Sequence, residues 1–249
     1  MWIRTLPMAM LSIALAGCHT ARSEYVPALQ PSQVADFAET FRIRYGGDSA
    51  GSMTLEVHVT RDSLISTIRG FYDGSLVQHV VVTFDPHSLR LREVRDSVPS
   101  RIEVLTYAAD RLRGMVVVQN LRDTRDTFHV NMPIDSLTFD RRSLLSVTPW
   151  VPLETGRMYS LRMFDPDTRT VYPARIAIGP KAAIAGPNGR VEAYRVELTT
   201  RPPKWFAPMS YVFPTVLWIR ADSSRRILRI ERPRIDAVYE LTVESPPRP

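Results

Sequence analysis

Apolar and polar residues alternate strictly in Met53-Thr54-Leu55-Glu56-Val57-His58-Val59, and this stretch defines the class of fold. A period of two places the apolar side chains on one face of a β-strand and the polar ones on the other. Phe41, Ile43 and Tyr45 alternate in the same way just before it. The pattern predicts neighbouring antiparallel strands with one buried face and one face in water.

The same pattern recurs along most of the chain. Further strands are predicted at 64–72, 76–84, 89–96, 101–108, 112–119, 126–130, 158–164, 170–178, 191–200, 214–221, 225–231 and 235–243. Turn-forming residues separate them, as in Tyr72-Asp73-Gly74-Ser75. A short helix is predicted within 134–151, before Pro152. Since no strand–helix–strand alternation occurs, we expect an all-β fold: a single curved antiparallel sheet forming a barrel or half-barrel, with at most one or two short helices.

The N-terminus carries an export signal. Arg4 precedes an apolar stretch at 6–16, and Leu15-Ala16-Gly17-Cys18 ends in the only cysteine of the 249 residues. This tetrapeptide resembles the lipobox of bacterial lipoproteins, which implies cleavage before Cys18, a diacylglycerol thioether on its sulfur and an acylated new N-terminus. His19 is not the Asp that resembles an inner-membrane retention signal. We therefore expect a membrane-anchored lipoprotein, on the outer membrane and facing the periplasm.

Composition narrows the class of protein further. With Cys18 acylated, no disulfide can form, so the core must supply the stability. The formal net charge is +6, and almost all of the basic residues are arginines, because Lys181 and Lys204 are the only lysines. The arginines alternate with acids, as on a solvated face, and an exported location conflicts with nucleic-acid binding. We expect no nucleic-acid partner.

The chain divides into four parts on these grounds. Residues 1–17 are the signal peptide, 18–38 the lipidated cysteine and a tether, 39–245 the β domain, and 246–249 a proline-rich tail that cannot continue a strand.

Several turn motifs resemble the DUF3108 family of uncharacterised exported bacterial proteins. They are Tyr45 and Gly51 before the first long hairpin, Phe84-Asp85-Pro86-His87-Ser88-Leu89-Arg90, Val151-Pro152-Leu153-Glu154-Thr155-Gly156-Arg157-Met158-Tyr159, the glycine turn and strand at 186–198, and Trp218-Ile219-Arg220-Ala221-Asp222-Ser223-Ser224-Arg225-Arg226. The resemblance covers about residues 41–243 and departs from the family at 122–134. It implies a curved antiparallel sheet and no particular activity.

Two motifs mimic catalytic or metal sites. Gly47-Asp48-Ser49-Ala50-Gly51 fits the nucleophile elbow of hydrolases, but a strand follows it where the elbow requires a helix, so we interpret it as a hairpin turn. Asp165-Pro166-Asp167 lacks the further oxygen ligands of a calcium loop and is interpreted as a turn. Paired carboxylates of the glycosidase kind stay open at this point, because their separation is a three-dimensional quantity.

The histidines give no local metal-ligand spacing. His58, His79 and His129 lie on separate predicted strands, and we assign them surface or hydrogen-bonding roles. The sequence thus predicts no catalytic residues, no metal site and no cofactor.

A proline-rich segment at 201–214 interrupts the strands and holds five large apolar residues: Trp205, Phe206, Met209, Tyr211 and Phe213. Combined with Arg201 and Lys204, they fit a lip that contacts lipid headgroups or gates an apolar lumen. The alternative is a loop packed over the end of the barrel.

Three function classes remain open. A binding module would hold a lipid or other apolar envelope component, and we expect this function first. A structural or assembly lipoprotein would instead present a sheet edge or face to an envelope protein partner. An enzyme would need a polar cluster converging in a pocket, and a hydrolase is the least expected class.

Overall fold

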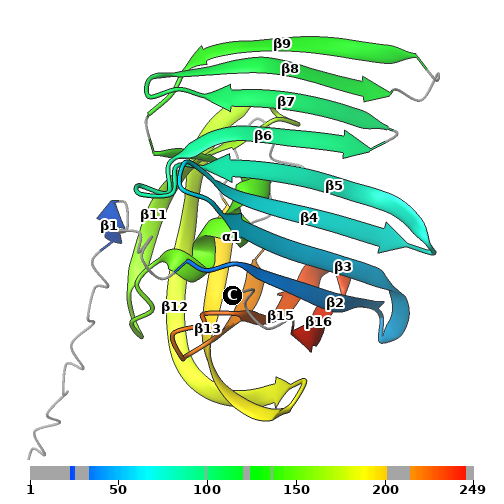
Figure 1. The fold of residues 1–249 in the computed structure, drawn as a ribbon, viewed down its shortest axis with the longest axis vertical. Helices are drawn as coiled ribbons and strands as arrows, with labels where there is room; N and C mark the ends of the chain where they lie inside the picture. The colour runs from blue at the N-terminus through cyan, green and yellow to red at the C-terminus, as the bar shows by residue number, and fades with distance from the viewer. Residues whose placement is uncertain are drawn as a thin grey trace, which may run out of the picture.

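The computed structural model describes residues 23–25, 34–98, 100–119, 124–135, 137–200 and 214–244. They form one large curved sheet that is not closed into a barrel (Figure 1). Its strand order is β1-β11-β12-β13-β14-β15-β16-β2-β3-β4-β5-β6-β7-β8-β9. The prediction of an all-β, curved half-barrel is confirmed.

The first half of the sheet is an antiparallel meander. Its strands are β2 (Phe37–Tyr45), β3 (Asp48–Val59), β4 (Leu64–Tyr72), β5 (Ser75–Phe84), β6 (Leu91–Val98), β7 (Arg101–Tyr107), β8 (Arg111–Gln119) and β9 (Arg125–Pro133). Each of these strands pairs with the next in sequence. Residues Met53, Leu55 and Val57 of the alternating stretch are all buried on the concave face, as predicted.

The second half continues the sheet on the other side of β2. It consists of β11 (Met158–Asp165), β12 (Thr170–Gly186), β13 (Gly189–Thr200), β14 (Thr215–Arg220), β15 (Ile227–Arg232) and β16 (Ala237–Glu244). Strand β16 pairs antiparallel with β2 and thereby joins the halves. Two short strands, β1 (Ser23–Tyr25) and β10 (Thr138–Asp140), pair with β11 in parallel, the exception to the antiparallel rule. Strand β1 lies within the span assigned to the tether.

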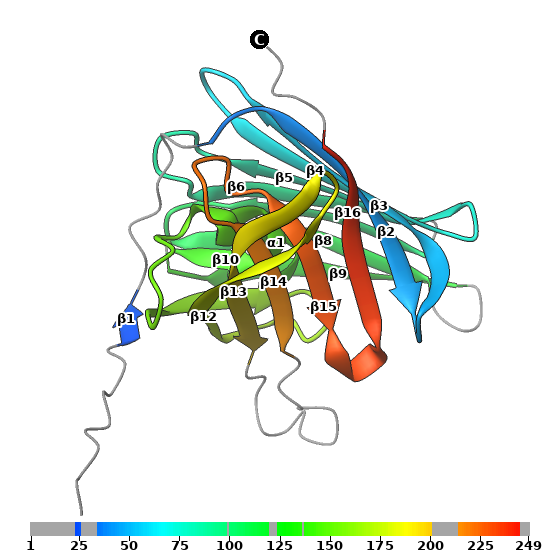
Figure 2. The ribbon, with the colours of Figure 1, turned by 90° about the horizontal axis from the view of Figure 1, so that it is seen from below.

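A short helical segment lies inside the curve of the sheet (Figure 2). It comprises the 3-10 turn η2 (Arg141–Ser143), helix α1 (Leu144–Val147) and the 3-10 turn η3 (Thr148–Trp150). Asp140 begins it by accepting a hydrogen bond from the Arg142 amide at 2.8 Å, and Pro152 lies just beyond its end. The predicted helix within 134–151 is therefore present.

This segment fills the concave side of the sheet with its own side chains. Those buried there are Phe139, Leu144, Val147, Trp150, Val151 and Leu153. The Ser146 hydroxyl lies 2.7 Å from that of Ser66 on β4, which fixes the helix to the sheet. Each large apolar side chain so buried contributes roughly 1.5–3 kcal/mol. We call residues 138–153 the plug.

Two details depart from the sequence expectations. Strand β12 continues to Gly186, eight residues beyond its predicted end, and β13 starts at Gly189, two residues before its predicted start, because a register shift between Ile178 and Lys181 lets pairing resume. The last strand was predicted to start at 235, but a 3-10 turn, η5 (Pro233–Ile235), precedes it and β16 starts at Ala237. Among the helices in the described ranges, none has the length and hydrophobicity that a membrane span requires.

Candidate functional site

Exposed apolar side chains gather at one end of the sheet. In the described part of the chain, seven large hydrophobic residues are exposed, and five of them lie at hairpin ends on this side: Tyr45, Tyr72, Leu76, Val77 and Ile235. We call these five the apolar rim. Tyr72 and Val77 are each 54% exposed, which is unusual for side chains of this kind.

The strand register places the rim residues on neighbouring hairpins. Ala237, which follows the turn containing Ile235, pairs with Tyr45, and the Gly46 amide donates to the Asp236 carbonyl at 3.1 Å. On the next hairpin, Tyr72 pairs with Gly51. Figure 1 shows the β2–β3 and β4–β5 hairpins ending on the same side of the molecule.

Gly51 pairs with Ile43 on one side and Tyr72 on the other, and it places no side chain between them. A Cβ at this position would lie 2.0 Å from the Phe71 carbonyl oxygen, so the backbone approach allows only glycine. The second glycine of the Gly47-Asp48-Ser49-Ala50-Gly51 motif is thus explained by packing. Asp48 and Ser49 begin β3 directly after the turn, as the hairpin interpretation predicted.

Two polar side chains, Tyr239 and Arg232, lie next to the rim. Tyr239 is buried two residues from Ala237, and Arg232 lies over its ring at 5.3 Å. Burial raises the pKa of Tyr239, so its hydroxyl stays protonated and is hydrogen-bonded to Tyr45. The rim therefore combines exposed apolar surface with tyrosine hydroxyls, the composition of side chains that sit where an apolar phase meets water.

The predicted site residues fall outside the described residues. Cys18 and the lip residues Trp205, Phe206, Met209, Tyr211 and Phe213 belong to this group. The residues that flank the lip segment are described, however. Thr215 starts β14 beside Leu198, Val216 pairs with Glu231, and β15 leads into the turn that carries Ile235. The segment at 201–213 thus leaves and rejoins the sheet at the end that carries the apolar rim.

A second cluster of functional interest is a network of charges between the plug and the sheet, which no local sequence pattern predicts. Arg142 of the plug lies 2.9 Å from Asp96 on β6 and 3.0 Å from Glu103 on β7. Arg101 of β7 lies 2.7 Å from Glu103, and the Tyr107 hydroxyl donates to Asp140 at 2.8 Å. We call these six residues, together with Arg141, Asp165 and Asp167, the ion cluster.

The ion cluster joins the two halves of the open sheet. Asp167, in the turn between β11 and β12, is bonded to both Arg101 of β7 and Arg141 of the plug. Asp165 accepts a hydrogen bond from the Tyr172 hydroxyl at 2.7 Å and lies 3.6 Å from Arg141. Both carboxyl groups of Asp165-Pro166-Asp167 are thus paired with arginines, and the chain turns directly after Asp165, as the turn interpretation predicted.

Burial shifts the titration of this cluster. It raises the pKa of Glu103 to about 7, with the neighbouring Asp140 adding to the effect, and it also raises the pKa of Asp96 and Asp140. Burial opposes ionisation of Asp167 as well, but Arg141 and Arg101 outweigh it and lower the pKa of that carboxyl. Five carboxyl groups face three guanidinium groups here, so the cluster would carry excess negative charge if every carboxyl group were ionised. A proton held by one of the carboxyl groups near neutral pH reduces this excess.

The carboxyl groups of the ion cluster converge on one guanidinium group. Asp96 and Glu103 are directly paired across β6 and β7, and the Glu103 and Asp140 side chains are fully buried. Arg142 lies within 4 Å of all three carboxyl groups and therefore occupies the space between them.

The histidines do not converge. His58 on β3 lies 2.8 Å from Asp36, His79 on β5 lies 3.0 Å from Ser97, and His129 is on the outermost strand β9. Within the described ranges, no three His, Cys, Asp or Glu side chains are grouped so that they could hold a metal ion.

These features define a class of protein: an open, strongly curved antiparallel sheet, plugged by its own helix and apolar at one end. The chain belongs to the family described as "Protein of unknown function (DUF3108)", which it matches over residues 40–242. A search of curated proteins gave no significant match.

Two solved structures are similar to this chain to different degrees. A β-barrel-like protein of the domain of unknown function DUF1849 from Brucella abortus superposes with a TM-score of 0.54 at 9% identity, covering 85% of this chain and 97% of its own. A candidate lipoprotein from Parabacteroides distasonis gives a TM-score of 0.32 at 11% identity, covering 90% of this chain and 100% of its own. Only the first similarity is strong enough to bear on this chain, and at such low identity it supports the fold alone.

Proposed function

We propose that this chain is an envelope lipoprotein, anchored through Cys18, whose β domain binds an apolar envelope component at the apolar rim. The observation that carries the proposal is the gathering of Tyr45, Tyr72, Leu76, Val77 and Ile235 at one end of the sheet. Exposed apolar patches on otherwise polar proteins mark sites of interaction with apolar partners.

Two further points support this location. The predicted lip at 201–213, with its five large apolar residues, joins the sheet at the same end. In addition, the plug fills the concave side of the sheet with buried side chains. We therefore place the ligand at the rim and the lip rather than deep in the half-barrel.

We propose binding and not catalysis as the function. The carboxyl groups that the fold brings together are paired with arginines and buried against the plug. Carboxyl groups that are paired and buried in this way do not present a reactive group to a substrate.

The anchor has a direct test. Cys18→Ala should move the protein from the membrane fraction to the soluble fraction, because two or three acyl chains are what make such an anchor stable. If the variant is still exported and still sediments with outer membranes, anchoring through Cys18 is wrong.

The rim has a separate test by native mass spectrometry of the intact acylated protein released from detergent micelles. We expect an additional non-covalent mass, and we expect Tyr72→Ser and Trp205→Ala to lower its occupancy. Ile102→Ser is the control, because Ile102 is an exposed apolar residue on β7, away from the rim. Equal occupancy in all three variants would rule out the rim as the binding site.

A further inference from the structure

The two margins of the sheet differ in how they end. On one side, β11 is covered by the parallel strands β1 and β10. On the other side, β9 pairs with β8 alone among the described strands, and Figure 1 shows it as the last strand of the sheet. A strand with one neighbour leaves half of its backbone N–H and C=O groups without a partner in the sheet.

The hydrogen bonds tell which backbone groups of β9 face outward. The Ile134 amide donates to the Asp110 carbonyl at 3.0 Å, one step beyond the Arg111–Pro133 pair. Because bonding directions alternate along an antiparallel strand, the even-numbered residues of β9 bond to β8. The N–H and C=O groups of Thr127, His129 and Asn131 therefore point to the open side.

Pro133 agrees with this assignment. It ends β9 at an odd-numbered position, where the missing N–H would face the open side and costs no bond to β8. The usable part of the edge is thus the stretch before Pro133.

This edge has no bulge and no lysine, two devices that commonly protect exposed edges from strand addition, and its proline stands at the end of the strand. The β8–β9 pair continues for nine residue pairs without a register shift, whereas six other strand pairs of the sheet contain one. Strand β9 also has no lysine, a residue that commonly blocks exposed edges. A long, regular edge of this kind is a template for another strand.

The convex face beside the edge is apolar and basic. Ile102 and Val104 on β7 are 40% and 36% exposed there, next to Val117 and Met115 of β8. The charged or titratable side chains on this face of β7–β9 follow: Arg111, Arg113, Arg125 and His129. Alternation along these strands places no carboxyl group of the described residues on this face, since Asp126 falls on the opposite one.

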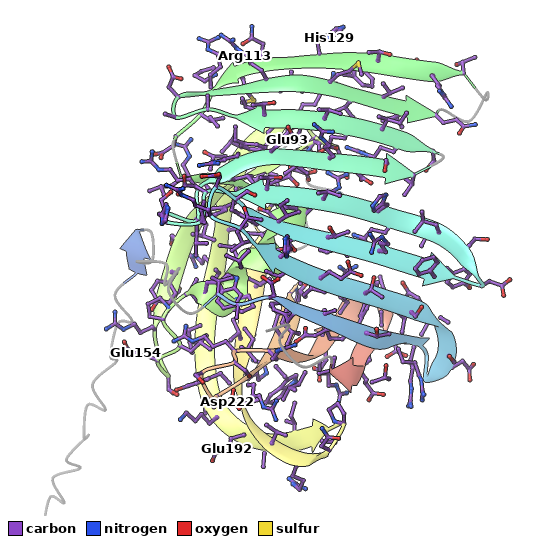
Figure 3. All side chains as sticks on the ribbon, in the orientation of Figure 1. Glu93, Arg113, His129, Glu154, Glu192 and Asp222 are labelled. Carbon is purple, nitrogen blue, oxygen red and sulfur yellow. The ribbon has the colours of Figure 1, made fainter. Side chains whose placement is uncertain are left out.

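The arginines on this face are available for an outside partner. Arg111 bonds to the Asn131 side chain at 2.9 Å, and within the described ranges no ion pair involves Arg111, Arg113 or Arg125. Figure 3 shows Arg113 and His129 at the outer margin of the sheet, while Glu154, Glu192 and Asp222 lie at the far end of the molecule.

We propose that β9 accepts an extended, acidic segment of a protein partner, which adds to the sheet as a further strand beside Thr127, His129 and Asn131. The open backbone groups supply the hydrogen bonds, and the basic convex face selects acidic side chains. A second copy of this chain fits less well, because two β9 edges side by side bring Arg125 and His129 of both copies onto one face. This inference goes beyond the proposed function and concerns a different surface.

The test uses the intact protein in detergent micelles and a fluorescent nine-residue peptide that alternates valine with glutamate. His129→Pro removes one outward N–H without breaking a bond to β8, whereas His129→Ala keeps that N–H. We expect the peptide to bind, His129→Pro to raise the Kd by about tenfold or more, and His129→Ala to change it by about twofold at most. A peptide with lysine in place of glutamate should bind far more weakly.

Amide exchange and a charge reversal complete the test. The peptide should slow exchange of the Thr127, His129 and Asn131 amides, which exchange faster than those of Phe128 and Val130 in its absence. If His129→Pro does not fold, Arg125→Glu serves instead, and it should weaken binding of the glutamate peptide relative to the lysine peptide.

The contrary outcomes are equally definite. Failure of the glutamate peptide to bind, or binding that survives His129→Pro in a folded protein, overturns the proposal. So does a concentration-dependent dimer that His129→Pro abolishes, which would assign the edge to a second copy. Binding to phosphatidylglycerol vesicles that needs the arginines but survives His129→Pro would assign the face to a lipid surface.

Discussion

Among the single residues, Glu103 is a buried carboxyl whose titration links the stability of the fold to pH. It is fully buried between Arg101 and Arg142, with Asp140 nearby, and its pKa is raised from 4.5 to about 7. The folded protein therefore holds a proton on this carboxyl between about pH 4.5 and pH 7, where the unfolded chain has released it. The contribution of Glu103 to stability is greatest below pH 4.5 and is lost as the pH rises through 7.

Glu103→Gln should remove this pH dependence. The neutral amide cannot ionise, so we expect the free energy of unfolding of the variant to fall less between pH 5 and pH 8, by about 3 kcal/mol at most. Urea unfolding at several pH values measures the slope. Glu154→Gln is the control, because the Glu154 side chain is 58% exposed and pairs with Arg157 at the surface. An unchanged slope in Glu103→Gln would show that Glu103 titrates normally.

For an element such as β7, alternation alone leaves the orientation undecided. In Arg101–Tyr107, Ile102 and Val104 are apolar on one face, and Leu105 and Tyr107 are apolar on the other. The structure buries Glu103, Leu105 and Tyr107. The reason is tertiary: Glu103 pairs across the strands with Asp96, and the plug supplies Arg142 to both. Arg142 lies 39 residues from Glu103 along the chain, so no window of local sequence contains it.

The orientation of β7 has a sharp test in two adjacent residues. Leu105 is fully buried, so Leu105→Ala should cost roughly 2–5 kcal/mol of unfolding free energy. Val104 is 36% exposed on the convex face, so Val104→Thr should change it by about 0.5 kcal/mol or less. Urea denaturation of both variants decides between the two orientations, because a strand shifted by one residue would reverse the two costs.

At the scale of the whole molecule, the sequence predicts the sheet well and its functional surfaces only in part. Period-two alternation and turn residues depend on neighbours along the chain, and they located nearly all of the long strands. The apolar rim is different, because it forms only when the β2–β3, β4–β5 and β15–β16 turns meet. The one local signal was Tyr72, Leu76 and Val77 flanking the predicted turn at Asp73-Gly74, where polar residues are usual.

The edge of β9 likewise depends on topology. Its sequence reads as one more strand, and only the strand order shows that no described strand follows it. The chain thus separates two surfaces: an apolar rim on the hairpins next to the β16–β2 join, and a basic edge at the end of the meander. Tyr72 on β4 is five strands from β9, or about 24 Å at the usual strand spacing.

This separation predicts that the two surfaces bind independently. Tyr72→Ser should weaken binding of the apolar dye N-phenyl-1-naphthylamine and leave the Kd for the glutamate peptide within about twofold, while His129→Pro should do the reverse. Sites this far apart without shared partners usually give additive effects, so the double variant should show both losses at their single-variant size. Fluorescence titrations of the four proteins measure this directly. A peptide affinity that falls in Tyr72→Ser would mean that the rim and the edge are coupled through the sheet and act as one site.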